Sequence, residues 1–209
     1  EQVQVVVVGG GPGGYAAAFH AADLGKDVAL IEQDTRLGGT CLLRGCIPSK
    51  AMITAAEMYQ KLLHADKMGI SFKEAHFDMK KMAAWRDGVI KDLSTGLDGL
   101  AKGRQIRRFN GRGYLKGPKE LAVASEGSSL SLQFEQAILA LGSKPIMPPP
   151  FVRSERVMSS DEALALDFLP PSVLVVGGGY IGIELGSCFA ALGSQVTVVE
   201  AFARLLPGT

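Results

Sequence analysis

Two stretches of this chain repeat each other, and the repeat limits the folds open to it. Residues 5–32, VVVVGGGPGGYAAAFHAADLGKDVALIE, align without a gap with residues 173–200, VLVVGGGYIGIELGSCFAALGSQVTVVE, and 12 of the 28 positions are identical. Each stretch has an apolar segment typical of a buried strand, a glycine-rich turn, a helical segment that ends at Leu-Gly, and a second apolar segment that ends at Glu. The order strand, helix, strand predicts an α/β fold with two Rossmann-like modules.

The glycines of the two turns follow the same G-x-G-x-x-G frame, which is Gly9, Gly11 and Gly14 in the first module and Gly177, Gly179 and Gly182 in the second. In such a frame the first glycine permits a tight turn, the second lets the backbone approach a pyrophosphate, and the third lets the helix pack closely on the strand. Each frame is followed by an acidic residue, Glu32 or Glu200, that is placed to hydrogen-bond an adenosine ribose. A dinucleotide is therefore predicted in each module, and the charge of Glu200 favours NAD over NADP in the second.

The residues between the repeats predict further elements. Residues 49–103 have Met, Leu and Ala at helical spacing, and Asp78 is placed to cap the second of two helices. Residues 111–141 alternate as strands do and predict a β-meander within the first module. The Pro-rich segment 144–150 predicts a connector.

The connector divides the chain into an expected first domain over 1–147 and an expected second domain over 148–209. A doubly wound sheet needs more strands than the second domain holds, so we expect this module to be truncated. The chain opens at Glu1 with no pattern of a signal or transit peptide.

Composition narrows the classes of partner. A formal net charge of +1 gives no broad attraction to nucleic acid or to an anionic membrane. No run of 18 apolar residues is present, so no transmembrane span is predicted. The one basic cluster, Lys102, Arg104, Arg107 and Arg108, is expected to be a solvated helix end. Three cysteines are too few for a secreted disulfide scaffold, and a cytoplasmic location is expected.

Cys41 and Cys46 lie five positions apart in the segment GGTCLLRGCIPSK. They lack the additional Cys or His ligands of a zinc site, so no metal site is predicted, and a reversible dithiol beside a dinucleotide suggests electron transfer. In a regular α-helix, such residues are about 7.5 Å apart along the axis. A disulfide between them would therefore require a distorted helix near Cys41. Two independent buried thiols or half of a metal site remain alternatives, and Cys188 is expected to be a packed thiol.

Two charged residues accompany the cysteines and the second glycine frame. Lys50 follows Cys46 by four residues and is placed on the same helix face. Glu184 lies in the first turn of the helix after Gly182, where the helix dipole stabilises a carboxylate. A Lys50–Glu184 pair bridging the two modules is the functional alternative. The three histidines, His20, His64 and His76, are expected to be structural.

Several motifs together resemble a known family. GGGPGG, GGTCLLRGCIPSK, ILALGSKP, GGGYIGIE and LGSQVTVVE occur in the order and spacing of the FAD-dependent pyridine nucleotide–disulphide oxidoreductases. The resemblance covers essentially the whole chain and is strongest to the dihydrolipoamide dehydrogenase branch.

The resemblance implies roles for individual residues. The first module would bind FAD through residues of its matching motifs, namely Gly9, Gly11, Pro12, Gly14, Glu32, Gly39, Thr40, Gly142 and Ser143. Cys41 would be the thiol that exchanges with substrate, and Cys46 would be the thiolate against the flavin. Lys50 and Glu184 would pair beside the flavin on the nicotinamide side. Gly177, Gly179, Gly182 and Glu200 would bind NAD, with Tyr180 where some relatives cover the flavin.

The resemblance also implies an activity. Electrons would pass from dihydrolipoamide through a Cys41–Cys46 disulfide and FAD to NAD. The implied partners are lipoyl domains of 2-oxo acid dehydrogenase complexes and a second subunit in a homodimer. The family's C-terminal dimerisation domain, with its His–Glu pair, is absent from the 209 residues. A mercuric or glutathione reductase, or a non-catalytic nucleotide-binding fragment, are the alternatives.

Overall fold

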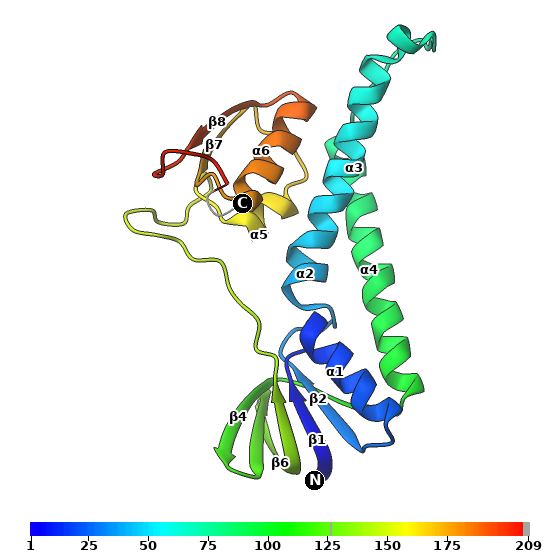
Figure 1. The fold of residues 1–209 in the computed structure, drawn as a ribbon, viewed down its shortest axis with the longest axis vertical. Coiled ribbons are helices and arrows are strands. Elements are labelled where there is room, and N and C mark those ends of the chain that lie inside the picture. The colour runs from blue at the N-terminus through cyan, green and yellow to red at the C-terminus, as the bar shows by residue number, and fades with distance from the viewer. Residues whose placement is uncertain (126, 207–209) are drawn as a thin grey trace. The chain divides into compact units, whose positions relative to one another are not determined.

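The computed structural model describes residues 1–125 and 127–206 (Figure 1). The chain forms two compact units. Unit 1 consists of Glu1–Leu43 and Ile90–Lys144, and unit 2 consists of Arg44–Val89 and Pro145–Thr209. Compact units and ligand-binding domains are different divisions of a chain, so the expected domain boundary at residue 147 stays a prediction.

Unit 1 is built on a six-stranded mixed sheet with the order β3-β2-β1-β6-β5-β4. Its strands are β1 (Gln2–Val8), β2 (Val28–Glu32), β3 (Arg107–Asn110), β4 (Arg112–Gly117), β5 (Glu120–Ser125) and β6 (Ser128–Leu139). The first three strands and β6 run parallel, with Val5 opposite Val28 on one side and Gln136 on the other. The strands β4, β5 and β6 pair antiparallel and form the predicted meander.

Both faces of the sheet in unit 1 are covered. One apolar cluster joins Val5, Val7 and Leu30 to Ala18 of α1 (Pro12–Asp23) and to Ala101 of α4 (Met79–Gly103). The other joins β1 and β2 to meander residues, and its fully buried members include Val6, Ile31, Leu121 and Leu132. A strand buried on both faces needs a continuous apolar run, which explains the valine-rich sequence of β1.

Unit 2 combines the second repeat with helices from the middle of the chain. It contains α3 (Cys46–Leu63), the 3-10 turn η1 (Ala65–Met68), the first part of α4, α5 (Ser160–Ala165), β7 (Ser172–Val176), α6 (Tyr180–Leu192) and β8 (Gln195–Val199). The strands β7 and β8 pair in parallel, with Val173 opposite Val196. Met52 and Ala56 of α3 share an apolar cluster with Leu185 and Phe189 of α6.

Most of the predicted elements are confirmed. Each repeat folds as strand, helix and strand, and the backbone N–H of Lys81 donates to the Asp78 carboxylate at 3.1 Å, as an N-cap requires. This hydrogen bond holds the pKa of Asp78 below its ordinary value. Residues 144–148 belong to no helix or strand, as expected for the connector.

The prediction that the basic cluster forms a solvated helix end is wrong. Only Lys102 lies in the last turn of α4, whereas Arg107 and Arg108 lie in β3. Arg107 pairs with Asp27 at 2.6 Å, and Arg108 pairs with Asp98 at 2.5 Å. These arginines therefore form ion pairs that join β3 to neighbouring segments, instead of standing as a solvated helix end.

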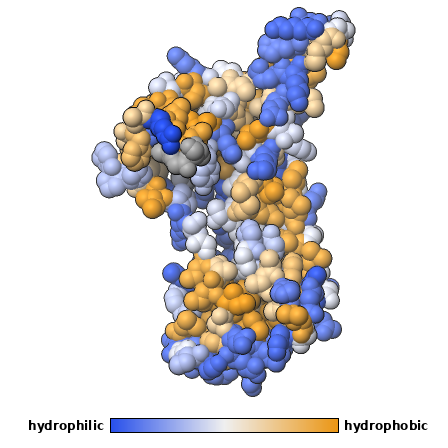
Figure 2. Space-filling model, viewed as in Figure 1, coloured by the Kyte–Doolittle hydropathy of each residue, from blue (hydrophilic) through white to orange (hydrophobic). Residues whose placement is uncertain are grey.

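Apolar side chains remain on the surface of the second module. Leu174, Val176 and Val199 point away from the core and are each more than half exposed, and Figure 2 shows apolar residues gathered on this part of unit 2. Across the described residues, each helix is too short or too polar to cross a lipid bilayer.

Candidate active site with two glycine loops and a cysteine pair

The first glycine loop connects β1 to α1. Gly9 has a φ of 108°, and a Cβ there would lie 2.0 Å from the carbonyl oxygen of Ala140 at the end of β6. A Cβ at Gly14 would lie 1.6 Å from the carbonyl oxygen of Gly9, so the helix packs directly on the turn. Gly11 is the N-cap of α1 and Pro12, which has no backbone N–H, is its first residue. The N–H of Gly14 donates to the carbonyl of Gly11 at 2.9 Å, so Gly13 is the residue of the first turn whose N–H has no partner within the helix.

Two further segments of unit 1 meet the first loop. A Cβ at Gly39 would lie 2.5 Å from the Cα of Gly11, so this approach is open only to glycine. The Thr40 hydroxyl donates to the carbonyl of Ser143 at 3.3 Å, which links the start of α2 (Gly39–Arg44) to the segment after β6. Gly142 adopts a left-handed φ of 69° in that segment. The first glycine loop, the start of α2 and the segment after β6 are therefore close together in unit 1, and Cβ atoms at Gly9, Gly14 or Gly39 would collide with backbone there.

Glu32 closes the first loop from the end of β2. Its side chain is buried, and its carboxylate accepts hydrogen bonds from the backbone N–H of Gly10 at 2.6 Å and of Asp34 at 2.8 Å. Charge-assisted bonds of this kind are stronger than neutral ones. Each carboxylate oxygen retains a lone pair that a ribose hydroxyl could use.

The second glycine loop reproduces the hydrogen bonds that the glutamate makes in the first. Gly177 also has a φ of 108°, and a Cβ at Gly182 would lie 2.3 Å from the Gly177 carbonyl oxygen. Glu200 accepts from the backbone N–H of Phe202 at 2.9 Å and of Gly178 at 2.5 Å. These two hydrogen bonds hold the pKa of the Glu200 carboxyl below its ordinary value, and the bond from Phe202 has the larger effect. The repeat therefore extends from sequence to hydrogen bonds, and the carboxylate is ionised at neutral pH.

The two cysteines lie on consecutive helices. Cys41 is in α2 and half-buried, Cys46 begins α3 and is exposed, and Gly45 between them has a φ of −140° and a ψ of −109°. The distortion that was expected near Cys41 lies instead at Gly45, because Cys41 is within α2 and the helix is interrupted only after Arg44. Ser49 is buried, and its hydroxyl donates to the carbonyl of Cys46 at 3.1 Å. Both cysteines carry thiols in this structure.

The helices α3 and α6 lie side by side in unit 2 (Figure 1). Near their ends, the Gln60 side chain donates from Nε2 to the carbonyl of Ala191 at 2.5 Å. Shared apolar contacts along their middle and this bond near both C-termini indicate that the helices run in the same direction. Lys50 and Glu184 each lie about one turn after the start of their helices and are exposed. No ion pair joins Lys50 to Glu184 among residues 1–125 and 127–206.

Three features of the site were not found from the sequence. Leu37 packs over Gly10, and Leu205 packs over Gly178 at the equivalent place in the second module. The repeat alignment stopped at the glutamates, and a longer alignment would have paired these leucines. The roles of Gln60 and of the buried Arg86 depend on backbone carbonyls distant in sequence, which no local pattern reveals.

Tyr180, the first residue of α6, is 70% exposed. Gly179 is the N-cap of the same helix, and a Cβ there would meet nothing within 4 Å. The helix start and this side chain are therefore accessible to a ligand. Cys188 on α6 is buried, and burial raises the pKa of its thiol to about 11, as suits the packed thiol that was expected.

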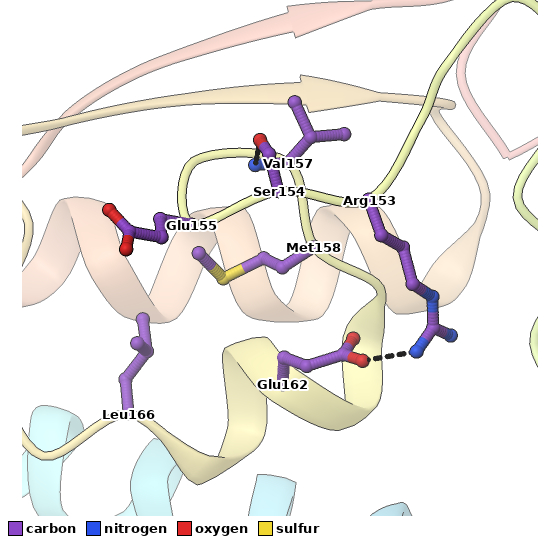
Figure 3. A pocket seen from close by; sticks show the side chains of 7 residues that line it. All are labelled: Arg153, Ser154, Glu155, Val157, Met158, Glu162 and Leu166. Carbon is purple, nitrogen blue, oxygen red and sulfur yellow. Dashed lines mark hydrogen bonds and ion pairs between the residues drawn. The ribbon is translucent and has the colours of Figure 1, made fainter.

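A cavity of about 250 Å³ lies elsewhere in unit 2 (Figure 3). Its lining includes Arg153, Met158, Glu162 and Leu166, and none of the predicted site residues. Arg153 and Glu162 neutralise each other across a 2.5 Å contact. The Ser159 hydroxyl binds the same carboxylate and holds the pKa of Glu162 below its ordinary value. Arg153 and Glu162 on this lining are thus already paired with each other, whereas Glu155, which also lines the cavity, is exposed.

Comparison with known proteins adds independent information. The pyridine nucleotide-disulphide oxidoreductase family matches residues 3–209. The chain is 42% identical over 207 residues to a dihydrolipoyl dehydrogenase of Geobacillus stearothermophilus and 45% identical over 209 residues to dihydrolipoyl dehydrogenase 2 of Haloarcula marismortui. These alignments cover 99% and 98% of this chain but only 44% of each relative.

Among solved structures, the chain is similar to the Cu(II) complex of the HOCl-induced flavoprotein disulfide reductase RclA from Escherichia coli. The TM-score is 0.86 at 29% identity, and the match covers 99% of this chain and 44% of that one. The chain therefore spans about 44% of the length of the proteins that it resembles.

Proposed function

Because this chain belongs to the pyridine nucleotide-disulphide oxidoreductase family, we propose that it is part of a dihydrolipoyl dehydrogenase. The observation that carries the proposal is that a glutamate makes the same two hydrogen bonds in each of two glycine-loop modules, with a cysteine pair on the helices that follow the first. One loop would serve FAD and the other NAD. The reaction would convert dihydrolipoamide and NAD⁺ into lipoamide, NADH and a proton.

In the first module, the chain's own backbone would hold the FAD pyrophosphate. The start of α1 would face the phosphates with the positive end of its helix dipole, and Gly11 and Gly39 would leave room for them. Glu32 would accept the ribose hydroxyls while keeping its bonds to the loop. When bound, FAD would supply two-electron chemistry between a dithiol and a nicotinamide.

Thiol exchange would use the two cysteines differently. One thiolate of dihydrolipoamide would attack Cys41 in a Cys41–Cys46 disulfide, forming a mixed disulfide and releasing Cys46 as a thiolate. The second lipoyl thiolate would then attack the lipoyl sulfur of the mixed disulfide and release the Cys41 thiolate. Lipoamide leaves oxidised, and the protein holds the electron pair as a dithiol. Ser49 would orient the turn that carries Cys46.

In the second module, Gly177, Gly179 and Gly182 would receive the NAD pyrophosphate at the start of α6. The ionised Glu200 would accept the adenosine ribose hydroxyls and would repel the 2′-phosphate of NADP. Tyr180 would flank the nicotinamide position. Lys50 and Glu184, on parallel helices, would pair on the nicotinamide side of the flavin.

Partners and location follow from the same proposal. The substrate dithiol would be presented on lipoyl domains of a 2-oxo acid dehydrogenase complex, to a homodimer in the cytoplasm. Neither nucleic acid nor membrane is proposed as a partner.

The test is anaerobic reduction of the FAD-loaded full-length protein by dihydrolipoamide. We expect flavin bleaching and a long-wavelength thiolate–flavin absorbance in the wild type. Cys46→Ser should lose that absorbance and turnover, whereas Cys188→Ser should keep both. Unchanged turnover in Cys46→Ser would refute the proposal.

The similarity to RclA supports a second candidate, in which the protein reduces a different disulfide or metal substrate. Parallel assays with lipoamide, glutathione disulfide and Hg(II) would separate dihydrolipoyl dehydrogenase from glutathione and mercuric reductase. A protein that is purified without bound flavin and reduces none of these three substrates would be a nucleotide-binding fragment without catalytic activity.

A further inference from the structure

At the C-terminus of α6, the backbone carbonyl of Ala191 accepts a hydrogen bond from a side chain of α3. Gly193 adopts a left-handed φ of 111°, and the N–H groups of Gly193 and Ser194 bind the carbonyls of Ala190 and Phe189. The carbonyl of Ala191 is also within the last turn, where no intrahelical N–H can reach it. Gln60 donates to that oxygen at 2.5 Å from a half-buried position on α3.

The other contacts between these two helices are mostly apolar. Met52 and Ala56 on α3 pack in one cluster with Leu185 and Cys188 on α6. Ridges of apolar side chains can interlock at more than one position along a helix, because the contacts have little directional preference. A hydrogen bond is satisfied at one distance and angle, so a single polar contact can select one register.

We propose that Gln60 is a positioning residue that sets the register of α3 along α6. The starts of the two helices carry the groups that the proposed function uses, with Cys46 and Lys50 on α3 and Tyr180 and Glu184 on α6. The register determines where the first turn of α3 lies, along the helix axes, relative to the first turn of α6. Gln60 thereby keeps the start of α3, which carries Cys46, beside the start of α6, which would bind NAD, although Gln60 itself would touch neither ligand. The consequence for the reaction rests on the proposed function, but the register itself does not.

The register is measured directly by pulsed electron resonance between spin labels at Lys61 and Ser187. Both positions are exposed, and Cys41→Ser with Cys46→Ser removes the accessible native thiols. We expect one narrow distance in this background. Adding Gln60→Met should broaden it or add a population shifted by about one helical turn, roughly 5.4 Å. Gln60→Lys, which retains a donor, should restore the narrow distance.

Glu57→Met is the matched control, because Glu57 is exposed on the same helix. It should leave the distance unchanged. A single unaltered distance in Gln60→Met would overturn the proposal, since the apolar contacts would then fix the register unaided.

The second readout separates the two halves of the reaction in the FAD-loaded full-length protein. In Gln60→Met, stopped-flow reduction of flavin by NADH should slow by about tenfold or more, while reduction by dihydrolipoamide should change by less than about twofold. Equal slowing of both, or of neither, would contradict the positioning role. If the wild type is not reduced by dihydrolipoamide, the proposed function fails, and the distance measurement still decides the register.

Discussion

Glu32, the last residue of β2, accepts a hydrogen bond at 2.6 Å from the backbone N–H of Gly10, which lies in the loop after β1. Glu200 accepts the equivalent bond from Gly178 at 2.5 Å. Each carboxylate binds a second N–H two residues after itself. The acidic residue of each module therefore organises the glycine loop before any ribose is bound. Substitutions there should affect the apo protein as well as its affinity for a dinucleotide.

Glu32→Gln should destabilise the apo protein and weaken FAD binding. The amide keeps one acceptor oxygen but places an NH₂ group against a backbone donor, so at least one charge-assisted bond is lost. Such bonds are worth about 1.5–3 kcal/mol each. Denaturant unfolding of the apo protein measures the first effect and flavin titration the second. The exposed Glu57→Gln should change neither, and an unaltered apo stability in Glu32→Gln would contradict the organising role.

The lowered pKa of Glu200 gives unit 2 a specific response to acid. Its unfolded pKa is near the ordinary 4.5 and its folded pKa is lower, because Phe202 and Gly178 donate to the ionised form. The unfolded state therefore binds more protons below pH 4.5, and the stabilisation is lost as the pH falls through the folded value. NMR titration of the Glu200 carboxyl should give a midpoint below 4.5. Glu200→Gln should reduce the loss of amide hydrogen-exchange protection in β8 as the pH is lowered.

Gly14→Ala and Gly182→Ala should each disrupt their own module. The new Cβ would lie 1.6 Å from the Gly9 carbonyl oxygen in the first case and 2.3 Å from the Gly177 oxygen in the second. Overpacking against backbone costs about 1–3 kcal/mol or more. Gly96→Ala is the control, because Gly96 lies within α4 with nothing near its Cβ position and should gain up to about 1 kcal/mol. Thermal unfolding of the three variants measures the difference.

The repeat made the fold of both modules predictable because strand, turn and helix signals agree locally. The strand β3 was missed because Arg107 and Arg108 have no apolar periodicity, and only pairing with Ala29 and Leu30 makes them a strand. Within the site, the glycine frames and Glu32 could be predicted from spacing. The bond from Gln60 to Ala191 joins residues 131 positions apart, so it depends on tertiary packing that the sequence pattern does not contain.

Arg86→Met should destabilise unit 2 by about 2–4 kcal/mol, since hydrogen bonds from a charged group are lost and carbonyls are left unsatisfied. Arg86 is 3% exposed and donates to the carbonyls of Leu164 at 2.5 Å and Leu166 at 3.1 Å, at the C-terminal end of α5. Arg86→Lys should recover part of the loss through one remaining donor. Arg112→Met, which loses only an exposed contact with the Tyr114 ring, should cost less than about 1 kcal/mol. Urea denaturation compares the three, and equal losses in Arg86→Met and Arg112→Met would contradict the prediction.

Cys188 should resist alkylation that modifies the exposed Cys46. Burial raises the pKa of Cys188 from 9.0 to about 11, so at pH 8 its thiolate fraction is about a hundredfold smaller than that of an ordinary thiol. The same shift makes stability fall as the pH rises from about 9 to about 11, because only the unfolded thiol ionises in that range. Iodoacetamide labelling followed by mass spectrometry measures the first effect. Cys188→Ala should remove the second, and labelling of Cys188 as fast as Cys46 in the native protein would show that the α3–α6 core is open.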